Sequence, residues 1–420
     1  LAGNVSSALV NVLQTPMIVL PQLAGPHGWK NAMEALNNAR KLYMGSTLTR
    51  QVQELGGGTT TQRAMYSIEN LVSQGKMPQY KALIEALKGH GLLTTSTARD
   101  ALHSENNSDS AYGPANKLQR VTTLVGTFMF HHAERMNREV TAVATYDLEM
   151  QRLKKDKPKM SEAERQDAAI REAIRMVEYT HGAGSTLAGP SLGQSDIGKV
   201  LMVFKRFAFT MYYMLFDTIR RSLPVPPDAT PEQRELAMAA RRQLLGIYGM
   251  SGLFAGVKGM PLYWIAEMAY DAFADDDEDQ FDEVMRKYLG EFLFKGPVNY
   301  VTNLGIADRV GWTDLIYRDQ KGDKADASVL SQILENVLGA PYAVVNNVFR
   351  GQELIAEGQF YRGVEAMLPV SLKNPMKAFR YATEGANTLR GDSVGDVNGY
   401  NAAMQTLGFA PADLLTKYEE

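Results

Sequence analysis

The amino-acid sequence predicts an all-α protein, an elongated multi-helix assembly with long helices and connecting loops rich in glycine and proline. Apolar residues recur at every third or fourth position over long stretches, which is typical of amphipathic helices. No stretch alternates apolar and polar residues for long enough to predict a sheet. With 45% hydrophobic and 22% charged residues, the 420-residue chain has the composition of a folded protein with a substantial core.

The composition also excludes several kinds of site. The chain has no cysteine, which excludes disulfides and cysteine-ligated zinc or iron–sulfur centres. Its formal net charge is −3 and it contains no block of five or more lysines and arginines, so a broad nucleic-acid-binding face is not expected. Its 21 methionines are typical of adaptable packing surfaces.

The order of the expected elements divides the chain into three regions. The N-terminal helical region, 1–113, contains an apolar run that Pro16 and Pro21 interrupt, and it ends in a polar loop. The central region, 114–280, carries the longest expected helix and the most apolar stretch. In the C-terminal helical module, 281–420, the expected helices are shorter and are separated by glycines and prolines.

Sequence patterns typical of helix N-termini predict where several of the helices begin. A short helix is expected over Asn31–Tyr43, where apolar residues lie near one face. Ser161 and Glu164 form a capping-box pattern, as do Thr230 and Gln233. A helix is therefore expected to begin just after Ser161 and just after Thr230.

The longest expected helix is Pro114–Lys155. It would be about 60 Å long at 1.5 Å per residue, and the chain offers few helices of similar length to pair with it. We therefore expect it to pack against other copies of the chain or against another protein. Its apolar stripe consists of Leu118, Val121, Val125, Phe128, His132, Met136, Val140 and Val143.

The most apolar stretch, Gln243–Phe273, has two interpretations. Between Leu244 and Ala266 its only charged residue is Lys258. A helix of about 20 apolar residues would span a bilayer core of about 30 Å. The stretch is expected either to be a buried hairpin at the centre of the fold or to leave that position and enter a membrane.

The glycines and the large side chains of this stretch have separate expected roles. Gly252 and Gly256 have the spacing that lets a second helix approach closely. The neighbouring apolar segment, 199–223, is expected to cover the stretch with the side chains of Val200, Phe204, Phe207 and Phe216. The candidate membrane-interacting residues are Leu244, Leu245, Leu253, Phe254, Leu262, Trp264 and Ile265.

No pattern in the sequence predicts a catalytic, metal or cofactor site. His131, His132 and Glu134 come nearest to a metal cluster, but adjacent residues on a helix point about 100° apart. Ser191 lies in a G-x-S-x-G string, but a nucleophile elbow needs a strand before it and a helix after it. A glycine- and serine-rich loop is expected there instead. We therefore expect no cofactor and no enzymatic activity in this chain.

Motifs in the last third of the chain and in the long helix resemble a known family. In the last third they are Arg350–Leu354 (RGQEL), Tyr361–Pro369 (YRGVEAMLP), Phe379–Gly385 (FRYATEG) and Thr388–Asp392 (TLRGD). The long helix contributes Phe130–Glu139 (FHHAERMNRE). Together they resemble the C-terminal, PLxRFG-type region of the large polyvalent proteins of tailed bacteriophages and prophages.

The resemblance implies a non-catalytic module similar to the internal virion, or DNA ejection, proteins of short-tailed bacteriophages. Such proteins are packaged in the capsid near the portal and are expelled with the genome to help form a DNA conduit across the host cell envelope. The implied partners are the portal, other internal core proteins, further copies of the chain, the envelope membrane after ejection, and genomic DNA by passage or weak contact. The alternative is the non-catalytic C-terminal region of a virion-associated enzyme, such as an RNA polymerase or a peptidoglycan-cleaving protein.

Two arginines in the terminal motifs are candidates for docking. Arg362 and Arg390 flank a helix expected over Pro375–Thr388. A guanidinium can bind a carboxylate or carbonyl groups through two N–H donors. Under one interpretation the two arginines dock the protein in the particle, and under the other they cap helices within the domain.

Overall fold

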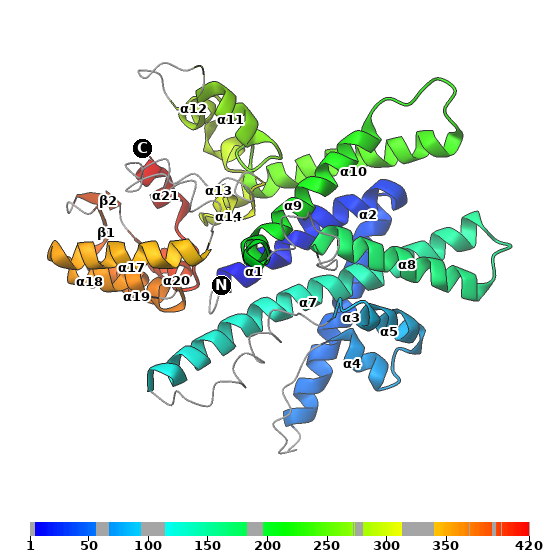
Figure 1. Ribbon diagram of the computed structural model, residues 1–420, viewed down its shortest axis with the longest axis horizontal. Coiled ribbons are helices and arrows are strands. Elements are labelled where there is room, and N and C mark those ends of the chain that lie inside the picture. Colours follow the sequence, from blue (N-terminus) through cyan, green and yellow to red (C-terminus); the bar gives the residue numbers. More distant parts are fainter. Residues whose placement is uncertain are drawn as a thin grey trace.

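The computed structural model describes residues 5–55, 67–93, 114–182, 196–271, 273, 280–312, 340–368, 370–388, 392–395 and 397–419. Over these residues the fold is all-α, as predicted, with one short β-hairpin near the C-terminus. Figure 1 shows the α7–α8 and α9–α10 helix pairs projecting to the right, whereas α17–α20 form a separate group at the left.

The helices up to residue 182 build the N-terminal half of the fold. They are α1 (Val5–Gln14), the π-helix η1 (Thr15–Val19), α2 (Leu20–His27), α3 (Trp29–Leu55), α4 (Ile68–Ser73), the 3-10 helix η2 (Pro78–Tyr80), α5 (Lys81–Gly89), α7 (Pro114–Asp156) and α8 (Glu162–His181).

The elements after residue 195 build the rest. They are α9 (Asp196–Ser222), α10 (Pro231–Ala255), α11 (Tyr263–Asp271), α12 (Phe281–Phe294), α13 (Pro297–Thr302), α14 (Ala307–Val310), α17 (Ala340–Ala356), α18 (Phe360–Met367), α19 (Val370–Glu384), β1 (Ala386–Asn387), β2 (Ser393–Gly395), α20 (Gly399–Thr406) and α21 (Ala412–Glu419).

Local signals explain where several helices begin. The Ser161 side chain accepts from the Glu164 backbone N–H and the Glu164 carboxylate accepts from Ser161, so the predicted capping box is confirmed. Thr230 and Gln233 form the second predicted box at the start of α10. The helix expected over Asn31–Tyr43 is longer, because α3 continues in both directions.

The N-terminal apolar run stays helical through its prolines. Pro16 lies in the wider turn of η1, which tolerates a residue without an N–H donor. Pro21 occupies the first turn of α2, where that donor is not needed. The type of helix therefore changes close to each proline, while the run as a whole stays helical.

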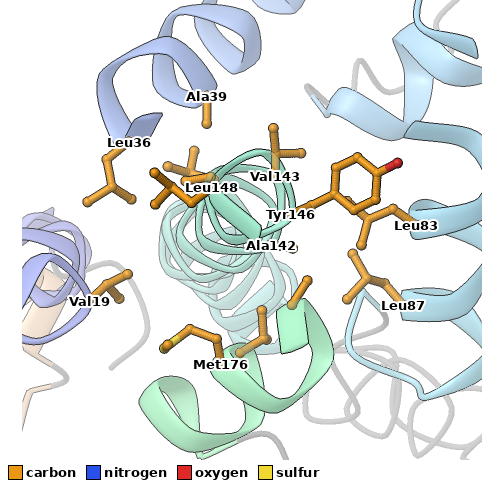
Figure 2. Packing of buried hydrophobic residues seen from close by; sticks show 14 of the residues in the cluster. Val19, Leu36, Ala39, Leu83, Leu87, Ala142, Val143, Tyr146, Leu148 and Met176 are labelled. Carbon is orange, nitrogen blue, oxygen red and sulfur yellow. The ribbon is translucent and has the colours of Figure 1, made fainter. Parts of the chain in front are cut away.

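The largest core surrounds the second half of α7. Figure 2 looks along α7 and shows η1, α3, α5 and α8 around it, with Val143 and Tyr146 pointing outward from α7 into this packing. From Ala133 to Leu153 most side chains of α7 are buried. Within the chain, α3 and α8 pack against α7, and both are shorter than α7, which has 43 residues. Packing of α7 against other copies or another protein stays a prediction.

A second core lies between η1, α9 and α10. Tyr212 of α9 donates its hydroxyl to the backbone carbonyl of Trp312 at 3.0 Å, and the two rings meet edge to face with centroids 5.9 Å apart. The indole N–H of Trp312 donates to Ser251 at 3.0 Å. Buried residues of this core are Met17, Ile18, Met211, Tyr212, Met214, Leu215, Ile247 and Trp312.

The cores do not follow the three predicted regions. The first core joins residues on both sides of residue 113, and the second takes residues from all three regions. The two ends of the chain also meet, because the Ser6 N–H donates to the Leu407 carbonyl at 3.0 Å and Arg309 binds both Ser6 Oγ and the Gly408 carbonyl. The predicted boundaries therefore do not separate packing units.

The C-terminal group departs from one helix prediction. α19 ends at Glu384, where Gly385 takes φ +75°, so the helix expected over Pro375–Thr388 is displaced. Pro375 lies inside α19 rather than at its start. After Gly385 the chain forms the β1–β2 hairpin, which is antiparallel and irregular in register.

Candidate functional site

The candidate membrane stretch is two helices joined by a turn. α10 ends at Ala255 and α11 begins at Tyr263. Between them Gly256 has φ +67° and Leu262 has φ +66°, conformations that no right-handed helix contains. A continuous helical span over 244–266 is therefore absent from this fold and would require the turn to refold.

The end of α12 fixes this turn. The N–H groups of Val257 and Lys258 donate to the carbonyls of Leu293 and Phe294 at 3.0 and 3.1 Å. A Cβ added at Gly256 would collide with that same backbone. The close approach predicted for Gly256 is therefore made by the C-terminal end of α12, at Phe294, and by Gly296 just after it.

The single charge between Leu244 and Ala266 is paired inside the fold. Lys258 Nζ lies 3.2 Å from Asp282 Oδ2, and the Asp282 side chain is almost completely buried. The Tyr263 hydroxyl donates to Asp282 Oδ1 at 2.9 Å. Burial, and then the Asp282 carboxylate, raise the pKa of Tyr263 far above its ordinary value, so it stays a neutral donor.

The seven candidate membrane-interacting residues fall into two groups. The half-buried group packs on the second core, and its Trp264 donates its indole N–H to the Tyr212 hydroxyl at 3.0 Å. The other group is exposed, with Leu245 reaching 76%. The half-buried residues are Leu244, Phe254, Leu262 and Trp264, and the exposed ones are Leu245, Leu253 and Ile265.

A different segment has the length and composition of a membrane span. Among the described residues, the one such helical run is Ala8–His27, which comprises most of α1 together with η1 and α2. More than half of its most apolar window is buried inside the fold, as in a core helix.

An exposed aromatic ridge runs along α9. Phe209, Tyr213, Phe216 and Arg220 alternate at spacings of four and three residues, which places them on one face of the helix. Leu223, the residue after the helix end, continues this spacing. The four apolar members are 52, 68, 53 and 55% exposed in that order. We call these five residues the α9 ridge.

Among the described side chains of α9, those that face away from the ridge include buried residues of the second core. Met211, Met214 and Leu215 are fully buried in the second core. A helix that is apolar on all sides is normally covered on all sides, so the ridge is the exception. Phe216 was expected to cover the stretch 243–273 and instead faces outward, so that prediction is wrong for Phe216. The other three side chains expected in this cover, Val200, Phe204 and Phe207, lie outside those described.

A second row of exposed side chains lies on α10. Met238, Leu245 and Leu253 are exposed at spacings of seven and eight residues. Gly249 lies between the two leucines, and a Cβ added there would meet nothing within 4 Å. Apolar side chains are also exposed on α12 and α13, where the rings of Phe292 and Tyr300 meet edge to face.

The terminal motifs hold the C-terminal group together. A Cβ on Gly351 of α17 would lie 2.7 Å from the carbonyl oxygen of Gly363 of α18, so the two helices cross in close contact at these glycines. Arg362 donates to the Asn387 carbonyl at 3.1 Å, beside the start of the hairpin. Arg362 thus caps local backbone within the domain, whereas Arg390 lies outside the described residues.

The polar side chains of α7 form ion pairs rather than a metal site. Glu134 binds Arg138, and Glu139 accepts from Arg135 and from the backbone N–H of Ile68. Within the residues that the structure describes, no group of three or more potential metal ligands is present. Ser191 and the His131 side chain lie outside the described residues.

Comparisons with known proteins give no relative. No family model, curated protein or solved structure matches the chain.

Proposed function

We propose that this chain is a structural module of a bacteriophage internal virion, or ejection, protein. In this proposal it resides in the virion interior near the portal and is expelled with the genome to help form a DNA conduit across the host cell envelope. The α9 ridge carries the proposal, because it is an exposed row of large aromatic side chains beside the buried residues Met211, Met214 and Leu215. Such a row favours contact with another macromolecule. The terminal motifs that resemble phage polyvalent proteins support the phage assignment.

The first partner that we propose for the ridge is another copy of the chain. A seam with alternating spacings of three and four residues suits pairing with a second helix. The ridge residues occupy two alternating positions of the seam: Tyr213 and Arg220 share one, and Phe209, Phe216 and Leu223 share the other. In an antiparallel pair, residues at one position contact residues at the other position on the second copy. Tyr213 and Arg220 of one copy therefore contact residues among Phe209, Phe216 and Leu223 of the other. Arg220 then lies against a phenylalanine or leucine, and contact with an aromatic ring stabilises a guanidinium. A parallel pair would instead place Arg220 opposite itself.

The other proposed partners use other surfaces. The portal and further internal core proteins are candidates for the exposed apolar side chains of α10, α12 and α13. The host envelope membrane becomes a partner only after ejection, and genomic DNA is contacted weakly, since the chain carries a net charge of −3. The module acts by assembly, and we assign no catalytic residue to it.

Particle assembly tests this function. A phage whose copy of the protein carries Phe209→Ser, Tyr213→Ser and Phe216→Ser is expected to form capsids with the protein depleted from the interior and with reduced infectivity. The matched control is Tyr288→Ser, which removes an aromatic side chain that is 84% exposed on α12. Normal amounts of the triple variant in infectious particles would contradict the proposal.

A further inference from the structure

The last residue of α8, His181, is a buried histidine close to the hydrogen bonds that attach α1 to α7 and α8. His181 Nε2 lies 3.0 Å from the Thr141 hydroxyl of α7. Its Nδ1 is buried and, among the described residues, has no hydrogen-bond partner. Arg138 is the charged group that acts on this imidazole. A proton added to His181 would therefore be buried next to a guanidinium.

The same place ties α1 and η1 to the rest of the fold. Gln14 donates its side-chain amide to the carbonyl of Thr180, the residue before His181, at 2.7 Å. Asn137, one turn before Thr141 on α7, donates to the Asn11 carbonyl at 2.6 Å and accepts from the Thr15 hydroxyl at 2.9 Å. These bonds hold the start of the run Ala8–His27, the segment with the composition of a membrane span.

We infer that His181 is an acid-sensitive latch, whose protonation opens the junction of α7 and α8 and releases α1 and η1. Neutral imidazole fills the junction and shares a hydrogen bond with Thr141. Imidazolium cannot stay there, because it places a charge in a buried position beside Arg138, where none of the described carboxylates contacts the ring. The latch does not depend on what the α9 ridge binds.

The described carboxylates on the surrounding elements lie near other groups. On α7, Glu134 pairs with Arg138. On α8, Glu178 lies 4.0 Å from His90 at the end of α5. On α9, Asp217 accepts from Arg221 and from Tyr179, and α1 contributes the neutral side chains Asn11 and Gln14.

The direction of the pH effect follows from linkage. Burial, and then Arg138, lower the pKa of His181 from 6.5 to about 3. An opened junction returns this pKa to 6.5, so the open form binds more protons between pH 6.5 and pH 3. Stability of the junction is complete above pH 6.5 and falls with pH below that value. At pH 5 the open population is expected to increase about 25-fold relative to pH 7.

A single cysteine can report this opening, because the chain has none of its own. Ala8 of α1 is 5% exposed, so an Ala8→Cys thiol is protected while α1 is docked. We would measure its reaction with a disulfide reagent that acts at acid pH, in the full chain with His181 or with His181→Gln. A cysteine at the exposed Lys76, in a separate protein, corrects for the intrinsic pH dependence of the reagent.

The expected result is a corrected rate that increases about 25-fold from pH 7 to pH 5 with His181, and at most about 3-fold with His181→Gln. Thr141→Val, which removes the hydrogen bond but keeps the imidazole, should retain the pH dependence. An equal increase with and without His181 overturns the latch. If His181→Gln does not fold, the imidazole NMR shifts of the unmodified chain decide: titration near pH 6.5 in folded protein overturns the proposal, and a neutral ring down to the opening transition supports it.

Discussion

Arg380 of α19 and Glu365 of α18 form a buried two-point ion pair, with Arg380 Nε 2.9 Å from Glu365 Oε2 and a terminal nitrogen 3.3 Å from Oε1. Both side chains are 8% exposed. The pair joins two of the motifs that resemble phage polyvalent proteins. Arg380, and not Arg362, is therefore the arginine whose guanidinium binds a carboxylate through two nitrogens.

Removing one partner of this pair should destabilise the protein strongly. Arg380→Ala leaves the Glu365 carboxylate buried without its counter-charge, at an expected cost of about 3–5 kcal/mol in the free energy of unfolding. Urea denaturation of the full chain measures this loss. The double variant Arg380→Met with Glu365→Leu should recover most of the stability, and equal losses in the single and double variants would contradict the pairing.

Two glycines one turn apart on α10 should respond oppositely to alanine. A Cβ at Gly246 would lie 2.8 Å from the Trp29 ring and 3.0 Å from Pro21 Cβ, so Gly246→Ala should destabilise the fold by about 1–3 kcal/mol. Gly249 faces open space, so Gly249→Ala should stabilise it by about 0.5–1 kcal/mol. Thermal unfolding of the two variants compares them directly, and a shift of the same sign in both would refute the packing of α2 on α10.

Glu139 should give a pH dependence opposite in sign to that of His181. Burial raises the pKa of Glu139 to about 7, against the opposing effect of Arg135. The folded state therefore binds more protons between pH 4.5 and pH 7, and this group makes the fold less stable as pH rises through that window. Glu139→Gln should remove that slope, although it also lowers stability at every pH, since one amide oxygen replaces two acceptors. Urea midpoints from pH 4 to pH 8 test this, and an unchanged slope would contradict it.

The sequence contained enough information for the fold class and for several helix boundaries. The length of α7 and the capping boxes at Ser161 and Thr230 are local properties, set by residues within one or two turns. The break at Gly256 also had a local signal in Gly259 and Pro261. Of the two interpretations of the stretch, the hairpin is the one that contains such a break.

Contacts between distant residues could not be predicted in the same way. The spacing of Gly252 and Gly256 indicated close packing of another helix. In the structure, the glycine of α10 that lies against Trp29 and Pro21 is Gly246. The sequence could not identify it, because the segment that packs on α10 is set by the tertiary fold. Likewise, α9 is apolar on every side, so periodicity could not tell the buried face from the α9 ridge. The ridge, which is the core of the candidate site, therefore became visible only in three dimensions.

The membrane hypothesis for the stretch 243–273 can now be tested without disturbing the core. Phe254 is half-buried in the second core, so the exposed residues Leu245 and Leu253 are the better targets. Partly unfolded protein should float with anionic liposomes, and Leu245→Asp with Leu253→Asp should abolish flotation, because each charge is costly in the hydrocarbon. Replacing Leu236, exposed near the start of α10, with aspartate is the control. Flotation that persists in the double variant would assign lipid binding to another segment, with Ala8–His27 the first to examine.

Sedimentation velocity of the full chain from 1 to about 100 µM, a range that covers typical micromolar affinities, tests the central claim that the α9 ridge pairs copies of the protein. The native chain is expected to form dimers as concentration rises, and Phe216→Arg to remain monomeric, since it places a second cation opposite Arg220. Phe216→Glu should retain part of the association, because a carboxylate can pair with that arginine, and Tyr288→Arg should behave like the native chain. A native chain that stays monomeric throughout, or dimers that form equally in all four proteins, would contradict the account.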